Sequence, residues 1–408
     1  MVKTHKKIQS IILKRLWRTI SILLLVRIGT FLPVPGINHS DLAFYIQDHS
    51  TIKSLVNTFS GNNILVNGLF TLNIFPYINA SILIQLILTI SPKLAKLQKD
   101  GGMEGRRVIN QLTRLLTLIW AIIQSLSLTV YLKQILFDWD YILAFEIIIW
   151  LTTGAMIVLW LSELITDYGL GNGASLLVYL NIISNLPNLI HLSHFNKTDF
   201  GFLIVISISL YSIVFLQEGN RPILLISAKQ LTQSKSITKE VKNFLPLKFN
   251  QAGVMPIILT TALLVIPNYV STLDLLPKFH FFESFTFLYW IGYFSLILIF
   301  SSFYSEIVLN PKDVADQLQK MAVIIPTVRP GIPTIFYLKQ VMQRITVIGS
   351  ILLAFIVITP NFIESTFNIT ELKGLSTSSL LILVGVLLDL IREASNIYYS
   401  NIYKNKYL

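Results

Sequence analysis

Cysteine is absent from this 408-residue sequence, and charged residues are scarce. Without cysteine the chain has no disulfides, no thiolate metal sites and no thiol chemistry. Charged residues make up 13% of the chain and hydrophobic residues 53%, and the mean hydropathy is +0.66. Ordinary soluble domains carry roughly 25% charged residues. The composition therefore excludes that class and indicates an integral membrane protein.

The sequence also lacks the pattern of a catalytic centre. No nucleophile, base and orienting group stand in a recognisable arrangement. His191 and His194 can share a helix face, but no carboxylate occupies a matching position for a metal site. The segment "GLGNG", Gly169–Gly173, follows an apolar run rather than a strand, which favours a tight turn over a phosphate-binding loop. We expect a conduit and not an enzyme, with no catalytic residue, metal or cofactor.

Long apolar runs recur along the whole chain. Each is close to the roughly 20 residues that a helix needs to cross about 30 Å of hydrocarbon. We predict an all-α polytopic membrane protein with ten transmembrane helices. The predicted spans are Leu16–Pro33, Ile74–Ile90, Leu112–Leu132, Tyr141–Leu161, Ala174–Ile190, Phe200–Leu216, Val254–Val270, Phe287–Ile307, Ile345–Pro360 and Leu375–Ile391.

The basic residues predict the orientation of these spans. Of the 32 Lys and Arg residues, 26 fall on segments of one side and five on the other, and Arg27 lies within the first span. Because basic loops stay on the cytoplasmic side, both termini are expected there or on its stromal equivalent. Ten spans divide into two inverted five-helix halves, residues 1–190 and 200–408, joined by a hinge at 191–199.

Two cytoplasmic loops, residues 217–250 and 310–343, are long and basic. Such loops suit the docking of an acidic or RNA-bearing partner, although their charge also serves simply to keep them inside. In "IPTVRPGIPT", Ile325–Thr334, three prolines flank Arg329. Because proline restricts the backbone, the loop is expected to be stiff and to present one guanidinium at its tip.

Eight segments in order along the chain resemble the SecY protein-translocation channel family. They are "RIGTFLPVPGI" from Arg27, "FPYINASILIQL" from Phe75, "EGRRVINQLTR" from Glu104, "ELITDYGLGNGASL" from Glu163, "LPLKFNQAGVMP" from Leu245, "NPKDVADQLQK" from Asn310, "IPTVRPG" from Ile325 and "YLKQVMQRITVIGS" from Tyr337. The resemblance implies a central pore that moves unfolded preproteins and releases membrane segments laterally into lipid. It further implies a complex with SecE and usually SecG, and a SecA motor or a ribosome as driver, without sequence-specific nucleic-acid binding.

The resemblance also assigns roles to individual residues. Residues 60–70 would form a plug half-helix, and Ile74–Ile90 would form one wall of a lateral gate, with Asn79, Ser81 and Gln85 as its polar contacts. The alternative for each of these three is an ordinary interhelical contact. The constriction ring of aliphatic side chains would consist of Ile74, Ile78, Ala174, Val178, Ile258 and Ile382. The basic loops would dock partners through Arg221 and Arg329.

Some positions depart from the family pattern. Ala174 is smaller than the usual aliphatic residue, and Arg221 stands where paired basic residues are usual. Ile, Asn, Lys, Phe and Tyr are abundant, as in an AT-rich genome, which favours a plastid-encoded chain in the thylakoid membrane over a bacterial plasma-membrane protein. A small-solute transporter with a 5+5 inverted repeat is the alternative function.

Overall fold

A computed structural model describes residues 2–35, 68–91, 94, 97, 102–132, 140–189, 197–227, 243–253, 255–257, 259–260, 286–326, 328–367 and 377–407. The chain forms two compact units. Unit 1 comprises residues 1–191 and 386–408, and unit 2 comprises residues 192–385. The predicted division into two inverted halves stays a prediction.

The described part of the chain is mostly helical, with helices where the apolar runs occur. The helices are α1 (Val2–Gly29), α4 (Phe75–Ile90), α6 (Gly102–Leu132), α7 (Tyr141–Tyr168), α8 (Gly173–Leu189), α9 (Lys197–Glu218), α12 (Thr286–Val308), α13 (Pro311–Lys320), α14 (Ile332–Phe367) and α15 (Thr377–Tyr407). Nine of the ten predicted spans coincide with one of these helices. The seventh, Val254–Val270, lies mostly outside the described residues.

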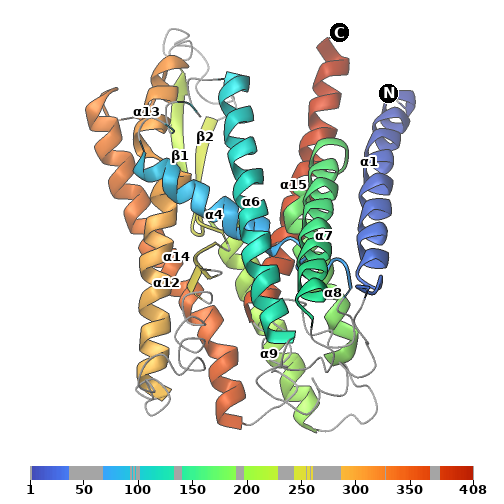
Figure 1. Cartoon of the computed structure of the whole chain (residues 1–408). Coiled ribbons are helices and arrows are strands. Elements are labelled where there is room, and N and C mark those ends of the chain that lie inside the picture. Colours follow the sequence, from blue (N-terminus) through green and yellow to red (C-terminus); the bar gives the residue numbers. More distant parts are fainter. Residues whose placement is uncertain are drawn as a thin grey trace. The chain divides into compact units, whose positions relative to one another are not determined.

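Four stretches of the described residues are long and apolar enough to cross a membrane by length and composition: Gly102–Val130, Tyr141–Tyr168, Trp290–Lys320 and Ile332–Thr359. Two further apolar helices, Phe75–Leu88 and Gly173–Ser184, are shorter. Within unit 1 the two chain ends lie at the same end of the bundle (Figure 1). Termini on the same side of a membrane require an even number of spans, and the predicted number of ten meets this requirement.

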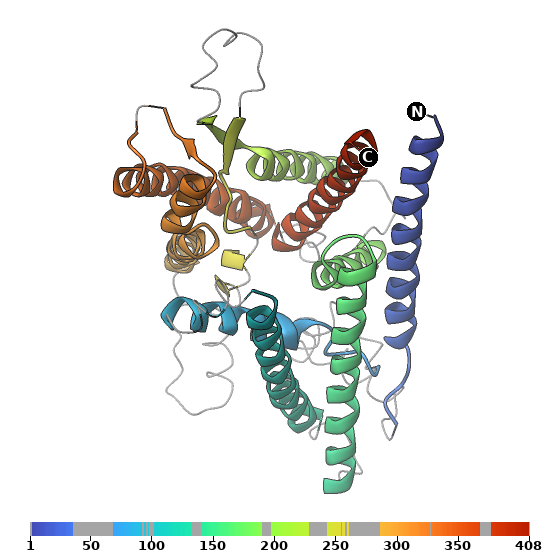
Figure 2. The same ribbon diagram turned by 90° about the horizontal axis from the view of Figure 1, so that it is seen from above.

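Unit 1 is built around α7. Helices α1 and α8 both contact α7, and α1 runs beside it in two views (Figures 1 and 2). The segment before α4 packs tightly against α7, because a Cβ atom at Gly154 would lie 2.0 Å from the carbonyl oxygen of Leu69. Glycine at position 154 therefore lets the chain enter α4 directly over the α7 backbone.

The "GLGNG" segment is the turn between α7 and α8, as the sequence indicates. Gly171 has a φ of +89°, a conformation that glycine adopts readily. The Gly173 backbone N–H donates to Thr166 Oγ1 at 3.0 Å, and the Ala174 N–H donates to Asn172 Oδ1 at 3.1 Å. The turn satisfies two N–H groups at the start of α8, which otherwise have no partner in the helix.

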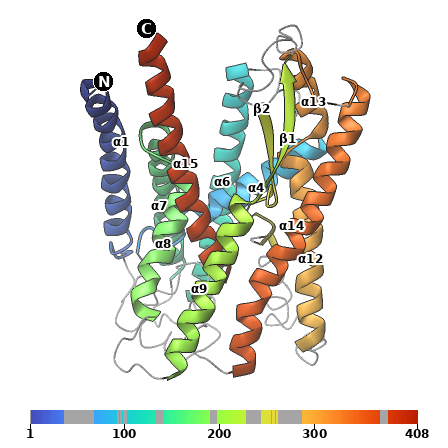
Figure 3. The same cartoon turned by 180° about the vertical axis from the view of Figure 1, so that it is seen from behind.

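Unit 2 contains a small sheet that the sequence analysis did not predict. Strands β1 (Asn220–Ser227), β2 (Asn243–Lys248) and β3 (Val323–Ile324) are antiparallel neighbours in the order β2-β1-β3. The sheet lies at the same end of unit 2 as α13 (Figure 3). Both predicted basic loops therefore contribute strands to one folded element.

This sheet and α13 share a hydrophobic core with the start of α14. Asn310 caps α13 by accepting the Lys312 N–H at 3.1 Å, and Pro311 occupies its first turn. One face of α13 is buried through Ala315 and Leu318. The cluster consists of Ile223, Leu247, Ala315, Leu318, Ile325, Leu338, Val341, Met342 and Ile345.

Candidate functional site

The start of α4 is held to α8 by a buried asparagine. Asn73 is only 5% exposed and has a φ of +47°, in the left-handed region. Its Nδ2 donates to Asn181 Oδ1 at 2.8 Å, and its Oδ1 accepts the Ile74 N–H at 2.8 Å. Asparagine is among the few side-chain-bearing residues that adopt this backbone conformation at low cost. Asn73 therefore combines the turn into α4 with a bond to α8.

Four of the six predicted ring residues come together in unit 1. Ile74 and Ile78 are one helical turn apart at the start of α4, and Ala174 and Val178 are spaced equally at the start of α8. All four belong to or pack against one cluster, whose fully buried members include Leu177. Ile74 is 1% exposed and is a core residue of unit 1. These four side chains thus belong to one packed aliphatic cluster, here named the aliphatic surface of α4 and α8.

The other two ring residues do not enter this surface. Ile382 is half-buried in the first turns of α15, in the part that belongs to unit 2. Ile258 lies outside the described residues. The closure of the ring as a whole stays a prediction.

A polar cavity of about 240 Å³ adjoins the aliphatic surface of unit 1. At its wall, Arg114 of α6 pairs with Glu163 of α7 through two parallel contacts, Nε to Oε1 at 2.8 Å and Nη2 to Oε2 at 2.8 Å. Ala174 lines the same cavity. The remaining lining residues are Tyr77, Asn110, Thr113, Ser162, Thr166, Asp167 and Asn172.

Sequence reasoning missed this cavity and its ion pair. Arg114 entered only the count of basic residues that predicts the orientation of the spans. Glu163 was only the first residue of a segment that resembles the family. The two side chains are 49 residues apart, so no local pattern pairs them. The signal that could have found them was a charged residue within or next to each of two predicted spans, since such residues are costly in a membrane unless paired or hydrated.

The predicted gate residues all lie on α4 and are half-buried. Ser81 Oγ donates to the carbonyl oxygen of Ile78 at 2.9 Å, within its own helix. Gln85 also has an interaction partner. Because the predicted opposite wall, Val254–Val270, lies mostly outside the described residues, pairing across the gate stays a prediction.

The two predicted docking arginines are exposed in unit 2. Arg221 lies on β1, opposite Leu247 of β2. Arg329 follows a turn in which the Val328 N–H donates to Ile325 O at 3.2 Å, and its own carbonyl accepts Thr334 Oγ1 at 2.8 Å. These bonds fix the backbone on both sides of Arg329. The presentation of the guanidinium itself at a stiff tip stays a prediction.

No group of three His, Asp or Glu side chains in the described part of the chain can hold a metal ion. His191 and His194 lie outside that part.

A family model described as SecY matches residues 68–391 of this chain. The chain is 56% identical over 411 residues to protein translocase subunit SecY of Trieres chinensis, with 96% of this chain and 97% of the relative covered. It is 43% identical over 397 residues to protein translocase subunit SecY of Porphyra purpurea, with 94% and 96% covered.

Two solved structures have a similar fold. One is a SecY channel whose plug domain is described as stabilising the closed state and maintaining a membrane seal; its TM-score is 0.67 at 18% identity, with 96% of this chain and 94% of that chain covered. The other is Sec61 in a canine ribosome–channel complex from the endoplasmic reticulum, with a TM-score of 0.63 at 17% identity and the same coverage.

Proposed function

Because the chain belongs to the SecY family of protein translocase subunits, we propose that the aliphatic surface of α4 and α8 is part of a pore that conducts unfolded polypeptides. The predicted all-α membrane fold is confirmed by its likeness to SecY and Sec61 channels, and the count of ten helices is consistent with it. The same findings do not favour a small-solute transporter. The observation that carries the proposal is the meeting of Ile74, Ile78, Ala174 and Val178 on one surface.

The pore would be sealed by the six ring residues, these four together with Ile258 and Ile382. Aliphatic side chains offer no hydrogen bonds to water or ions, so a narrow ring of them excludes both by dewetting. The same side chains bind an extended peptide weakly, which lets successive segments pass. Ala174 has the smallest side chain of the six, so the opening of the ring would be wider at this position, next to the polar cavity.

The polar cavity would form part of the water-filled approach to this seal. The Arg114–Glu163 pair is exposed enough to remain hydrated, with side-chain exposures of 53% and 32%. Arginine and glutamate in this arrangement neutralise each other, so the pair itself adds no net charge to a cavity whose lining also includes Asp167. The pair also joins α6 to α7, which keeps the wall of the approach in place.

Signal sequences and membrane segments would leave the pore through a lateral gate beside α4. An apolar helix gains about 25 cal/mol for each Å² of apolar area removed from water, so it moves into lipid once a path opens. Asn79, Ser81 and Gln85 supply hydrogen-bonding groups worth about 1 kcal/mol each, enough to hold a gate without locking it. Residues 60–70 would form the plug on the exterior side; in the similar SecY channel, a plug domain stabilises the closed state.

Partners would bind at the folded end of unit 2. Arg221 and Arg329 are exposed there on the sheet and its neighbouring loop, a surface suited to acidic or RNA-bearing partners. A SecA motor and a ribosome are the proposed drivers, and SecE with SecG would complete the complex; the similar Sec61 structure is itself a ribosome complex. The chain is an integral membrane protein. We propose the plastid thylakoid as its membrane, with both termini on the stromal side, and a bacterial plasma membrane as the alternative.

The proposal is tested by trapping a preprotein in the reconstituted translocase. The preprotein carries a tightly folded domain at its C-terminus, so that its unfolded part remains in the pore. A photo-crosslinking residue placed at position 78 or 178 should capture the preprotein, whereas the same residue at Ile149, an exposed position on α7, should not. Capture at Ile149 alone, or at none of these positions with a stalled preprotein present, would refute a pore along α4 and α8.

A further inference from the structure

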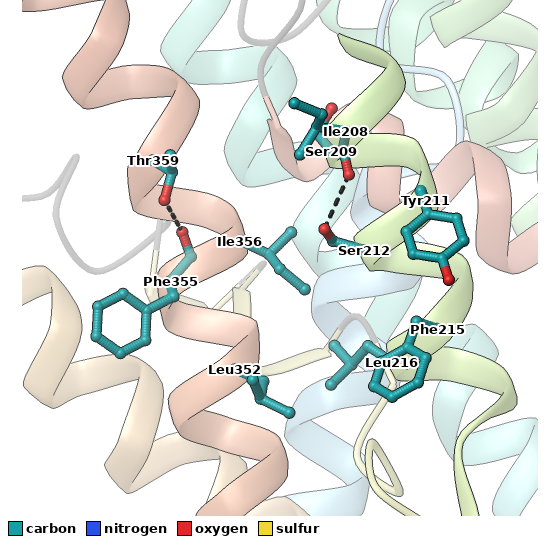
Figure 4. A pocket seen from close by; sticks show the side chains of 10 residues that line it. All are labelled: Ile208, Ser209, Tyr211, Ser212, Phe215, Leu216, Leu352, Phe355, Ile356 and Thr359. Carbon is teal, nitrogen blue, oxygen red and sulfur yellow. Dashed lines mark hydrogen bonds between the residues drawn. The ribbon is translucent and has the colours of Figure 1, made fainter. Parts of the chain in front are cut away.

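Helices α9 and α14 of unit 2 enclose a groove with a volume of about 440 Å³. Figure 4 shows α9 contributing Ile208, Ser212 and Leu216 to one wall, while Leu352 and Ile356 of α14 point toward them from the other. The wall area is predominantly apolar. Its volume falls in the range of roughly 300–1,000 Å³ that is typical of small-molecule sites.

The groove lies at membrane depth, because its lining falls within the apolar runs Phe200–Leu216 and Ile345–Pro360. Two of its hydroxyl groups are already bonded within their own helices. Ser212 Oγ donates to Ile208 O at 2.8 Å, and Thr359 Oγ1 donates to Phe355 O at 2.6 Å. A site with predominantly apolar walls at membrane depth selects an apolar occupant.

The groove is long and apolar, as an acyl chain requires. From Ile208 to Leu216 it extends about 12 Å along α9, at 1.5 Å per residue. A flexible hydrocarbon chain lies along such a groove without displacing either wall.

A cationic group stands on α14 beyond one end of the groove. Arg344 is exposed and lies eight residues before Leu352 and eleven before Phe355, so the three share one side of the helix. The distance along the axis from Arg344 to Leu352 is about 12 Å. Within the described residues no carboxylate pairs with Arg344, and Glu306 lines a separate cavity together with Lys339.

From this arrangement we infer that the groove binds one acyl chain of an anionic glycerophospholipid, with the lipid phosphate at Arg344. Arg344 immediately precedes the predicted span Ile345–Pro360, on the side expected to carry the basic loops, which is the depth of a lipid headgroup. A guanidinium binds phosphate through paired N–H donors. The inference depends on the membrane insertion of this chain and not on its role in transport.

The acyl-chain part is tested with a phosphatidylglycerol that carries a photoreactive diazirine in its chain. The purified translocase is labelled in lipid vesicles, and the labelled peptides are identified by mass spectrometry. Labels are expected on both Tyr211–Leu216 and Leu352–Thr359. Ser212→Trp fills the groove and should reduce this labelling at least fivefold.

Ser295→Trp is the matched control for the filling variant. Ser295 is exposed on α12, and its hydroxyl also bonds within its own helix, to Gly292 O at 2.9 Å. This control should leave groove labelling unchanged. Equal labelling in Ser212→Trp and the parent would overturn the acyl-chain site. A photoreactive residue placed in the groove that captures a partner helix instead of lipid would overturn it as well.

The headgroup part is tested by competition with unlabelled lipids. In the parent, unlabelled phosphatidylglycerol should displace the probe from the groove better than phosphatidylcholine does. Arg344→Gln should remove this preference, Arg344→Lys should retain most of it, and Arg107→Gln, which removes an exposed arginine of unit 1, should leave it intact. An undiminished preference in Arg344→Gln would refute the phosphate contact.

Discussion

Asn73 provides the sharpest test of how the start of α4 is held. Replacing it with glycine removes its bonds to Asn181 and to the Ile74 N–H, at about 1 kcal/mol each. Replacing it with alanine removes the same bonds and adds roughly 1 kcal/mol, because alanine disfavours the φ of +47° at this position. We therefore expect losses of about 2 kcal/mol for Asn73→Gly and about 3 kcal/mol for Asn73→Ala.

The order of these two variants is the informative result. In ordinary helical or strand conformations glycine is the more destabilising residue, whereas at Asn73 alanine should be. The thermal stability of the purified complex in detergent measures this order. Equal stability of the two variants, or a more stable alanine variant, would refute the backbone argument.

The same variants connect the turn to the seal. If the α4–α8 bond holds the closed pore, losing its share of about 1 kcal/mol raises the open population roughly fivefold. Resting ion conductance of the complex in a planar bilayer should rise accordingly. Ser184→Ala is the control, because the Ser184 hydroxyl donates to Asn181 O within its own helix, and it should leave conductance unchanged. If Asn73→Ala has the same resting conductance as the parent, the turn at Asn73 does not hold the pore closed.

Three further changes test the pore, the docking surface and the gate. Ile78→Ser should wet the aliphatic surface and raise resting conductance in a planar bilayer, and unchanged conductance would remove Ile78 from the ring. Arg329→Glu reverses an exposed charge at a fixed backbone position and should slow motor-driven or ribosome-coupled translocation without affecting insertion, so parental translocation kinetics would contradict a docking role. Gln85→Leu should favour the open gate by about 1 kcal/mol, or about fivefold, and let less hydrophobic signal sequences through in a translocation assay; a demand for more hydrophobic signals would show that Gln85 does not hold the gate closed.

The folded end of unit 2 illustrates where sequence reasoning was incomplete. The basic loops were recognised from their length and charge, but their sheet was not. Strand β1 pairs with β3 about a hundred residues later, through Ile226 opposite Ile324. Neither strand forms a long alternating pattern on its own, and β3 has only two residues. Such short strands become stable only through partners supplied by the tertiary fold.

The amino-acid sequence alone specifies the membrane class, the positions of most helices and the side on which each loop is expected to lie. These follow from local physics, because each span must satisfy its own backbone in lipid and each basic loop resists translocation. The motifs around α4 and α8 also identified the family and the aliphatic residues that meet in unit 1.

Which polar groups satisfy one another depends on the tertiary fold. The bond from Asn73 to Asn181 joins residues 108 positions apart, and the Arg114–Glu163 pair joins two different helices. The same holds for the groove between α9 and α14, whose walls lie more than a hundred residues apart in the chain. Hydropathy records how apolar each segment is, but a hydrogen bond or a cavity depends on which faces the fold brings together, and that is a property of the packed helices rather than of any one of them.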